Sequence, residues 1–166
     1  MTENNIKKMN TKFVGHHVSS GGFIFYKNPQ NDELYILLIK NKKGEWWIPK
    51  GHIEENEDHV TAAFREIEEE VGLKREQLKY VDLCHLYEFS FIDEQGHSNT
   101  KEIYMNVFMA TDVHDLIMEQ NNTTDIRDVA WLPYDKGLEM IMSFSKNELV
   151  KAKEIYELFL NKHKIV

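Results

Sequence analysis

Residues 51–73 read GHIEENEDHVTAAFREIEEEVGL, and this stretch decides how the chain is expected to fold. From Asp58 to Val71, apolar residues recur at the three- and four-residue spacing that places them on one side of a helix. Asn56 is positioned to cap the start of this helix, and Gly72 is a typical C-terminal stop. The sequence therefore predicts an amphipathic helix over 58–71, with an apolar side made of Val60, Ala63, Phe64, Ile67 and Val71.

The polar side of the same helix carries three glutamates close together. Glu66, Glu69 and Glu70 stand at positions i, i+3 and i+4, so their carboxylates share one face. Their repulsion costs helix stability unless a cation neutralises it, and oxygen ligands suit hard cations such as Mg²⁺, Mn²⁺ and Ca²⁺. The alternative is a solvated acidic face, which is what most charge runs form.

The spacing of the flanking residues resembles the Nudix box, Gly-x5-Glu-x7-Arg-Glu-U-x-Glu-Glu-x-Gly-U, in which U is aliphatic. Gly51 is followed by Glu57, and then by the run from Arg65 to Leu73, and together these residues fit every specified position. From average residue frequencies, a chance match in one window is on the order of 10⁻⁸ or rarer. The match therefore favours a metal site over a solvated face, and the chain is identified as similar to Nudix hydrolases.

This resemblance implies a fold of the α/β (α+β) class, a Nudix-like α/β/α sandwich with a central mixed sheet. It also implies that water cuts a phosphoanhydride bond with Mg²⁺ or Mn²⁺ as cofactor. The implied metal ligands are Glu66, Glu69, Glu70 and the carbonyl oxygen of Gly51, and the implied catalytic residues are Glu66, Glu69, Glu57 and Arg65. Glu57 and Arg65 are expected to form a supporting pair, because the rigid fork of an arginine can hold two carboxylates. Glu66 is the first choice as general base, and the alternatives in downstream loops are Glu119, Asp125 and Asp128.

The residues before the box indicate a substrate. Trp46-x-x-Pro49-Lys50-Gly51-His52 resembles the WxxPKGH stretch of the asymmetric diadenosine tetraphosphate hydrolases. This resemblance implies six substrate contacts, which are Trp46, Lys50, His52, Tyr87, Lys101 and Tyr104. The last pair departs from the Lys-x-x-x-Tyr run of that branch, because only two residues lie between Lys101 and Tyr104. Core packing is the alternative for Trp46, and a purely structural place in a strand is the alternative for the two tyrosines.

Outside the box, the chain has the pattern of a mixed α/β protein. Strands are expected over Phe13–Tyr26, Leu34–Ile39, Tyr80–Phe91 and Ile103–Ala110, with residues 93–100 as the hairpin loop between the last two. Ser145 begins a capping box with Glu148, which predicts a C-terminal helix over 145–163. The expected organisation is a polar tail over 1–11, followed by a single domain over 12–166.

Composition excludes several classes of protein. The 166 residues carry a net charge of −8, which disfavours a protein that binds long nucleic acid through a cationic surface. No apolar run reaches the roughly 20 residues that span a bilayer, and the N-terminus lacks the apolar segment of a secretory signal. Cys84 is the only cysteine, so the expected location is the cytoplasm. The expected partner is a small-molecule nucleotide, and the C-terminal helix could form part of a homodimer face.

Three other functions fit parts of this pattern. A Nudix hydrolase could act on a nucleoside triphosphate, an ADP-sugar, a diphosphoinositol polyphosphate or an RNA 5′ end. A nucleotide-sensing Nudix-like domain would bind without hydrolysis, although every carboxylate of the box is present here. A protein that docks a basic partner on its acidic helix would leave the positions of Gly51, Arg65 and Gly72 unexplained.

Overall fold

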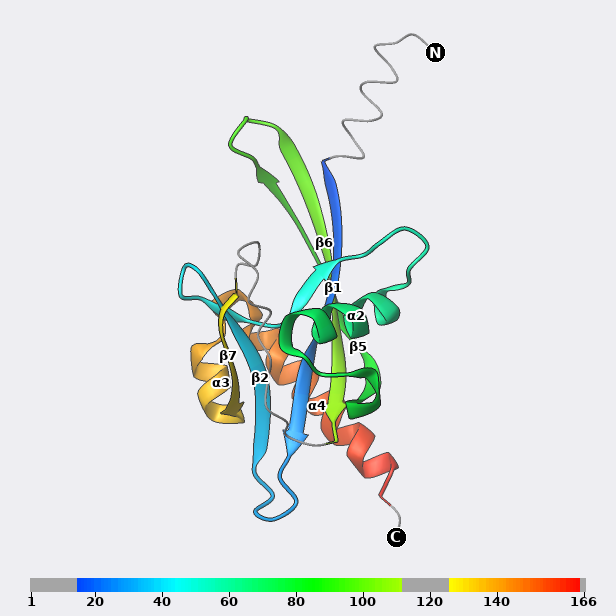
Figure 1. Ribbon diagram of the computed structural model, residues 1–166. Coiled ribbons are helices and arrows are strands. Elements are labelled where there is room, and N and C mark those ends of the chain that lie inside the picture. The colour runs from blue at the N-terminus through cyan, green and yellow to red at the C-terminus, as the bar shows by residue number, and fades with distance from the viewer. Residues whose placement is uncertain (1–14, 112–125, 165–166) are drawn as a thin grey trace.

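A mixed β-sheet lies at the centre of the computed structural model, which describes residues 15–111 and 126–164 (Figure 1). The strand order is β3-β2-β1-β6-β5, with β4 paired to β1 and β7 paired to β2. β1 and β6 run parallel, and the other named pairs are antiparallel. The strands are β1 (His16–Lys27), β2 (Leu34–Asn41), β3 (Trp46–Trp47), β4 (Lys50–His52), β5 (Leu78–Ile92), β6 (Ser98–Ala110) and β7 (Ile126–Pro133). The expected tail over 1–11, the start of the first strand at Phe13 and two loop acids, Glu119 and Asp125, lie outside the described residues.

Helices cover both faces of this sheet. α2 (His59–Val71) packs on one face, and α3 (Tyr134–Met140) and α4 (Lys146–Lys162) pack on the other (Figure 1). Successive side chains of a strand point to opposite faces. Phe25 of β1 therefore stacks on Tyr156 of α4, with ring centres 5.0 Å apart, while the neighbouring Ile24 belongs to the cluster under α2. This arrangement confirms the α/β/α sandwich that the sequence predicts.

The helix that carries the glutamates begins slightly later than the sequence predicts. Asp58 is its N-cap, because its Oδ1 accepts a hydrogen bond from the backbone N–H of Thr61 at 2.7 Å. Asn56 instead lies in the left-handed region, at φ +64°, within the turn before the helix. Gly72 ends the helix at φ +79°, as expected.

α4 follows Ser145 directly and ends at Lys162, close to the expected bounds, but tertiary contacts decide two features that the sequence did not predict. Ser145 makes no capping hydrogen bond to α4; its Oγ accepts one from the indole N–H of Trp47 at 2.9 Å. α3 was not predicted at all. It is held by packing, since Gly137 lies so close to Ile36 of β2 that an added methyl group would collide with it. A short helix fixed by its neighbours leaves little periodic signal in the sequence.

The hairpin formed by β5 and β6 is longer than expected. The paired strands reach from Leu78↔Ala110 to Ile92↔Ser98, so residues 98–100 belong to β6 rather than to the loop. Figure 1 shows that the far end of this hairpin, together with the start of β1, extends beyond the layers of helices.

Among the described helices, none is both long enough and apolar enough to cross a membrane.

Candidate active site

The acidic side of α2 lies against the open edge of the short strand β4. On one edge, β4 pairs with β1. On the other, the backbone N–H of Lys50 donates to Glu70 Oε2 at 3.0 Å, and the carbonyl oxygen of His52 accepts from Arg65 at 2.9 Å. Side chains of α2 therefore satisfy backbone groups that a neighbouring strand would otherwise bind.

Two glycines make this close packing sterically allowed. A methyl group at Gly21 of β1 would collide with the carbonyl oxygen of Pro49, and one at Gly51 would collide with the carboxylate of Glu66. A glycine inside a strand is typical of such a close backbone approach. At both positions the absence of a side chain lets β4 lie between β1 and α2.

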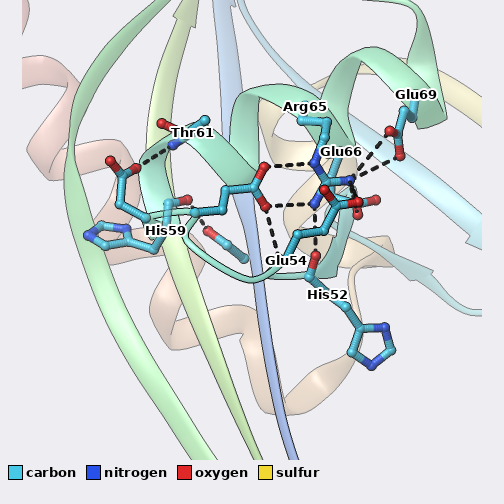
Figure 2. A network of polar contacts seen from close by, with 10 residues as sticks. His52, Glu54, His59, Thr61, Arg65, Glu66 and Glu69 are labelled. Atoms are coloured by element: carbon cyan, nitrogen blue, oxygen red, sulfur yellow. Dashed lines mark hydrogen bonds and ion pairs between the residues drawn. The ribbon is translucent and has the colours of Figure 1, made fainter.

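Arg65 holds the acidic residues of α2 and the preceding loop together (Figure 2). Its Nε and Nη2 each donate to one carboxylate oxygen of Glu57 at 2.8 Å, and its Nη1 donates to Glu66 Oε1 at 2.8 Å. Glu69 is more weakly held, with its nearer oxygen 3.3 Å from Nη1. The hydrogen bonds from Arg65 hold the pKa of Glu57 below its usual value, and those to Glu57 raise the pKa of Arg65. The expected pair of Glu57 and Arg65 is thus present as a bidentate contact.

The three glutamates of the box differ in their exposure to solvent. Burial raises the pKa of Glu70 to about 8 and raises the pKa of Glu66 as well, because a desolvated carboxylate resists ionisation. The Glu66 side chain is 13% exposed, whereas that of Glu69 is 50% exposed. Two shielded acids and one open acid therefore lie along the same side of α2.

A cavity of about 620 Å³ joins these carboxylates to a pair of lysines. Glu66, Glu69 and Glu70 line it from α2, and Lys50 and Lys101 line it from β4 and β6. Burial, and then the neighbouring Lys101, lowers the pKa of Lys50 to about 8; burial also lowers the pKa of Lys101. An anionic ligand between the two ammonium groups would relieve their mutual repulsion.

The structure brings together only part of the expected set of substrate contacts. Lys50, His52 and Lys101 line the cavity. Burial, and then the positive charge of the nearby Lys101, lowers the pKa of His52. Trp46, Tyr87 and Tyr104 are not among the residues that the structure places around the cavity.

Each of these three aromatic residues has a structural contact elsewhere. Trp46 packs against the core cluster under α4. Tyr104 stacks on His59 at the start of α2, with ring centres 4.5 Å apart. Tyr87 lies beside Phe144, with ring centres 5.4 Å apart.

Trp47 lines the cavity, whereas the neighbouring Trp46 does not. Trp47 was not among the predicted substrate contacts. The ammonium group of Lys50 lies 5.0 Å from the centre of a Trp47 ring, which is a cation–π distance. Adjacent residues of a strand face opposite ways. The WW pair therefore indicated that one ring could face the site, but it did not indicate which.

Backbone alternation also changes the expected carbonyl ligand. Gly22 donates to the carbonyl of Pro49 at 3.2 Å and Ile53 donates to that of Val18 at 2.9 Å, so the odd-numbered residues of this segment face β1. Alternation directs the peptide groups of Gly51 toward β1 as well, and those of Lys50 toward the open edge beside Glu70. The carbonyl of Lys50 is therefore better placed than that of Gly51 to face a cation at the glutamates.

Of the candidate general bases, Glu66 lines the cavity and Asp128 does not appear among its lining residues. Asp128 is an exposed residue of β7, paired across the sheet with Lys40. The geometry therefore favours Glu66 over Asp128.

The comparison with known proteins agrees with this geometry. The family model of the NUDIX domain matches residues 15–152. This chain belongs to the Nudix family. It is a Nudix hydrolase, an enzyme that cuts pyrophosphate bonds.

Several relatives of this Nudix hydrolase have named activities. It is 29% identical over 147 residues to an RNA pyrophosphohydrolase of Ruthia magnifica subsp. Calyptogena magnifica, which covers 81% of this chain and 82% of the relative. It is also 29% identical over 89 residues to the asymmetrical bis(5′-nucleosyl)-tetraphosphatase of Caenorhabditis elegans, over 53% of this chain and 63% of the relative. The match to the mRNA-decapping protein g5R of African swine fever virus, 29% identical over 79% of this chain, spans about half of that relative, 55%.

Solved structures show the same fold. The C. elegans Ap4A hydrolase in a binary complex superposes with a TM-score of 0.61 at 20% identity, over 88% of this chain and 98% of that chain.

Nudix hydrolases use divalent metal ions, and the side chains of this site fit one in chemistry. Carboxylate oxygens from three positions on one side of α2 border one cavity, and they are the hard donors that Mg²⁺ and Mn²⁺ prefer. Within residues 15–111 and 126–164, no three acidic, histidine or cysteine side chains already converge as ligands of one ion. The carboxylates are instead hydrogen-bonded to Arg65 and to the backbone N–H of Lys50.

Proposed function

We propose that this Nudix hydrolase binds Mg²⁺ or Mn²⁺ through Glu66, Glu69 and Glu70 and cuts a phosphoanhydride bond of a dinucleoside polyphosphate. Diadenosine tetraphosphate, split into ATP and AMP, is the first substrate to test. The observation that carries the proposal is the shared cavity, in which the carboxylates of α2 lie together with two neighbouring lysines. A metal site beside a cationic pair suits a substrate with several consecutive phosphates.

The bound cation would supply charge neutralisation at the phosphates and a more acidic water. Glu66 accepts the proton of the attacking water, whose oxygen bonds to phosphorus as the phosphoanhydride P–O bond breaks. The leaving phosphate departs with the electron pair of that bond. Lys50 and Lys101 bind non-bridging phosphate oxygens, and Arg65 keeps Glu66 in place through the 2.8 Å hydrogen bond.

Trp47 is the side chain best placed to receive a nucleobase. It lines the cavity beside Lys50, and a flat ring next to a phosphate-binding lysine suits a base attached to the bound phosphates. The similarity to the C. elegans tetraphosphatase supports the same substrate.

A triphosphorylated RNA 5′ end is the second candidate, and two relatives named for action on RNA support it. The RNA pyrophosphohydrolase matches this chain over most of both lengths, and the viral decapping protein matches over most of this chain. The chemistry at phosphorus would be the same, and only the group attached to the phosphates would differ.

Two further properties belong to this proposal. The only cysteine is buried and unpaired, in keeping with action in the reducing cytoplasm. A homodimer through the face of α4 that carries the exposed Leu158 stays a prediction.

The proposal is tested by a substrate panel with Mg²⁺ and with Mn²⁺, the products being resolved by chromatography. Diadenosine tetraphosphate should yield ATP and AMP in equal amounts. Glu69→Gln should abolish the reaction, whereas Glu68→Gln, on an exposed position of the same helix outside the cavity, should not. Robust cleavage of triphosphorylated RNA without cleavage of the dinucleotide would replace the first candidate by the second. Nucleotide binding without cleavage of any phosphoanhydride bond would indicate a sensor and refute both.

A further inference from the structure

The hairpin that extends beyond the helices carries a row of aromatic rings, one half-buried and two exposed. Tyr87, Phe89 and Phe91 alternate along β5, so they point to the same face of the sheet. Ring centres are 5.3 Å apart from Tyr87 to Phe89 and 6.0 Å apart from Phe89 to Phe91. The two phenylalanines are each 37% exposed, which is unusual for such large apolar side chains. We call Tyr87, Phe89 and Phe91 the aromatic row.

The aromatic row continues to the active-site cavity without a break. Tyr87 contacts Phe144, and Phe144 contacts Trp47 edge-on, with ring centres 5.4 Å and 5.1 Å apart. Trp47 lines the cavity beside Lys50. At the outer end, His17 lies between Phe91 and His52, with centre distances of 6.2 Å and 5.9 Å, and His52 also lines the cavity.

The charge of this face is unlike that of the whole chain. In the sheet register, Phe89 stands opposite Lys101, which stands next to His17, and Phe91 stands opposite Asn99. None of these side chains is a carboxylate, although the chain has a net charge of −8; one carboxylate, that of Asp93 beyond the end of β5, accepts a hydrogen bond from the Asn99 amide at 2.9 Å. The opposite face of the same hairpin carries Glu88 opposite Glu102. The face of the aromatic row is therefore less acidic than the other, and the better suited to a chain of phosphates.

We infer that the aromatic row binds the first nucleotides of a single-stranded RNA whose 5′ phosphates occupy the cavity, through stacking of bases on Phe89 and Phe91. Every base has a π-face, so rings spaced along a strand with a lysine beside them form a platform that accepts any sequence. RNA chains begin with a 5′ polyphosphate, which is the end that a cavity lined by Lys50 and Lys101 would hold. Because the row is short, the contact is limited to the first nucleotides of the RNA, in agreement with a chain that carries a net negative charge. The inference rests on the proposed function, and in particular on its second candidate.

A binding experiment tests the aromatic row separately from hydrolysis. The probe is a hexanucleotide RNA with a 5′ monophosphate, which has no phosphoanhydride bond to cut, and AMP is the reference ligand. The wild-type protein with Mg²⁺ should bind the hexanucleotide more tightly than AMP. Phe89→Ile with Phe91→Ile keeps strand propensity and apolar surface but removes both π-faces. This double variant should lose about tenfold or more in affinity for the RNA, with AMP binding unchanged. Ile92→Ser is the matched control, because Ile92 is 75% exposed on the other face of β5, and it should bind like the wild type.

Three results would overturn the inference. The first is equal RNA affinity in the wild type and the phenylalanine double variant, and the second is a hexanucleotide that binds no better than AMP. The third is a wild-type dimer that the double variant converts to a monomer, which would assign the row to a second copy of this chain. Diadenosine tetraphosphate cleavage is measured on the same samples. Loss of RNA binding in the double variant, with no phosphoanhydride cleavage by any protein, would sustain this inference and refute the proposed function. Normal cleavage of diadenosine tetraphosphate, with RNA binding unaltered in the double variant, would support the proposed function and refute this inference.

Discussion

Replacement of Arg65 by lysine tests how the acidic cluster is held in place. Arg65 makes two hydrogen bonds to Glu57 and one each to Glu66 and the carbonyl of His52, at 2.8–2.9 Å. A lysine keeps the positive charge, but its single ammonium group cannot bind Glu57 bidentately and reach the other two acceptors at once. The carboxylate of Glu66 would then lose its fixed orientation.

The expected effect on activity follows from this loss. Removing a partner that orients metal-binding side chains costs about 10–100-fold in metal affinity or activity. That range equals about 1.4–2.8 kcal/mol of transition-state stabilisation. Bonds to charged groups contribute about 1.5–3 kcal/mol each to stability. Because Arg65 is 23% exposed and lysine retains part of the attraction, we expect a loss of only about 1–3 kcal/mol in the free energy of unfolding.

The assay is steady-state hydrolysis at increasing Mg²⁺ concentrations, together with urea denaturation of the same protein. Arg65→Lys should lower kcat/KM by 10–100-fold, by the same reasoning, and shift half-activation to higher Mg²⁺. Arg75→Lys is the matched control, because Arg75 lies on the Phe64 ring at 4.1 Å and outside the cavity, and it should leave both values unchanged. A folded Arg65→Lys protein with wild-type kcat/KM and Mg²⁺ dependence would refute the reasoning.

Three further predictions concern single positions. Gly51→Ala should lower kcat/KM by about tenfold or more in a protein with a normal circular dichroism spectrum, because the methyl group displaces the Glu66 carboxylate; unchanged kinetics would contradict this. Asn106→Ala should lower the free energy of unfolding by about 2–4 kcal/mol in urea titrations, because the buried amide is hydrogen-bonded to Ser20, His59 and Tyr80. A change below about 0.5 kcal/mol would contradict this, because it would mean that these three side chains form other hydrogen bonds in the variant. Burial raises the pKa of the Cys84 thiol to about 11, so a thiol reagent at pH 8 should label the folded chain far more slowly than the denatured chain. The raised pKa contributes stability that is present below pH 9, the usual value, and is lost as the pH rises toward 11; a stability curve that stays flat between these values would contradict that sign.

Much of the fold could be predicted from local pattern. The apolar stripe of α2 is strong, and Ile67 and Val71 are fully buried as expected. The N-cap was assigned to the wrong residue because Asn56 and Asp58 have equal intrinsic preference for the position. Only the turn geometry, with Asn56 at φ +64°, places Asp58 at the cap.

Long-range pairings could not be predicted in the same way. β1 and β6 run parallel through ten paired positions, from His16↔Thr100 to Phe25↔Met109. The local sequence of either segment does not indicate with which strand it pairs. The hydroxyl of Ser145 was expected to cap α4, but it accepts a hydrogen bond from the indole N–H of Trp47, which lies 98 positions earlier in the chain. A side chain with two available partners is assigned by tertiary packing, which the local sequence does not contain.

In the candidate site too, the features set by local spacing could be predicted and those set by strand pairing could not. Spacing on one helix placed Glu66, Glu69 and Glu70 on a common side, because helix periodicity is local. The substrate side depends on how β3, β4 and β6 meet. Lys50 and Lys101 line one cavity only because β4 and β6 both pair with β1, with Lys50 opposite Gly21 and Lys101 opposite His17. The choice of Trp47 over Trp46 depends on the same strand geometry.

Binding of Mn²⁺, followed by the loss of its free-ion paramagnetic resonance signal, tests most directly whether the glutamates of α2 hold the metal. The wild-type protein should show a saturable site, and Glu69→Gln and Glu70→Gln should each weaken it about tenfold or more, while Glu68→Gln on the exposed side should not. Identical titration curves for all four proteins, or no saturable site in the wild type, would contradict the account.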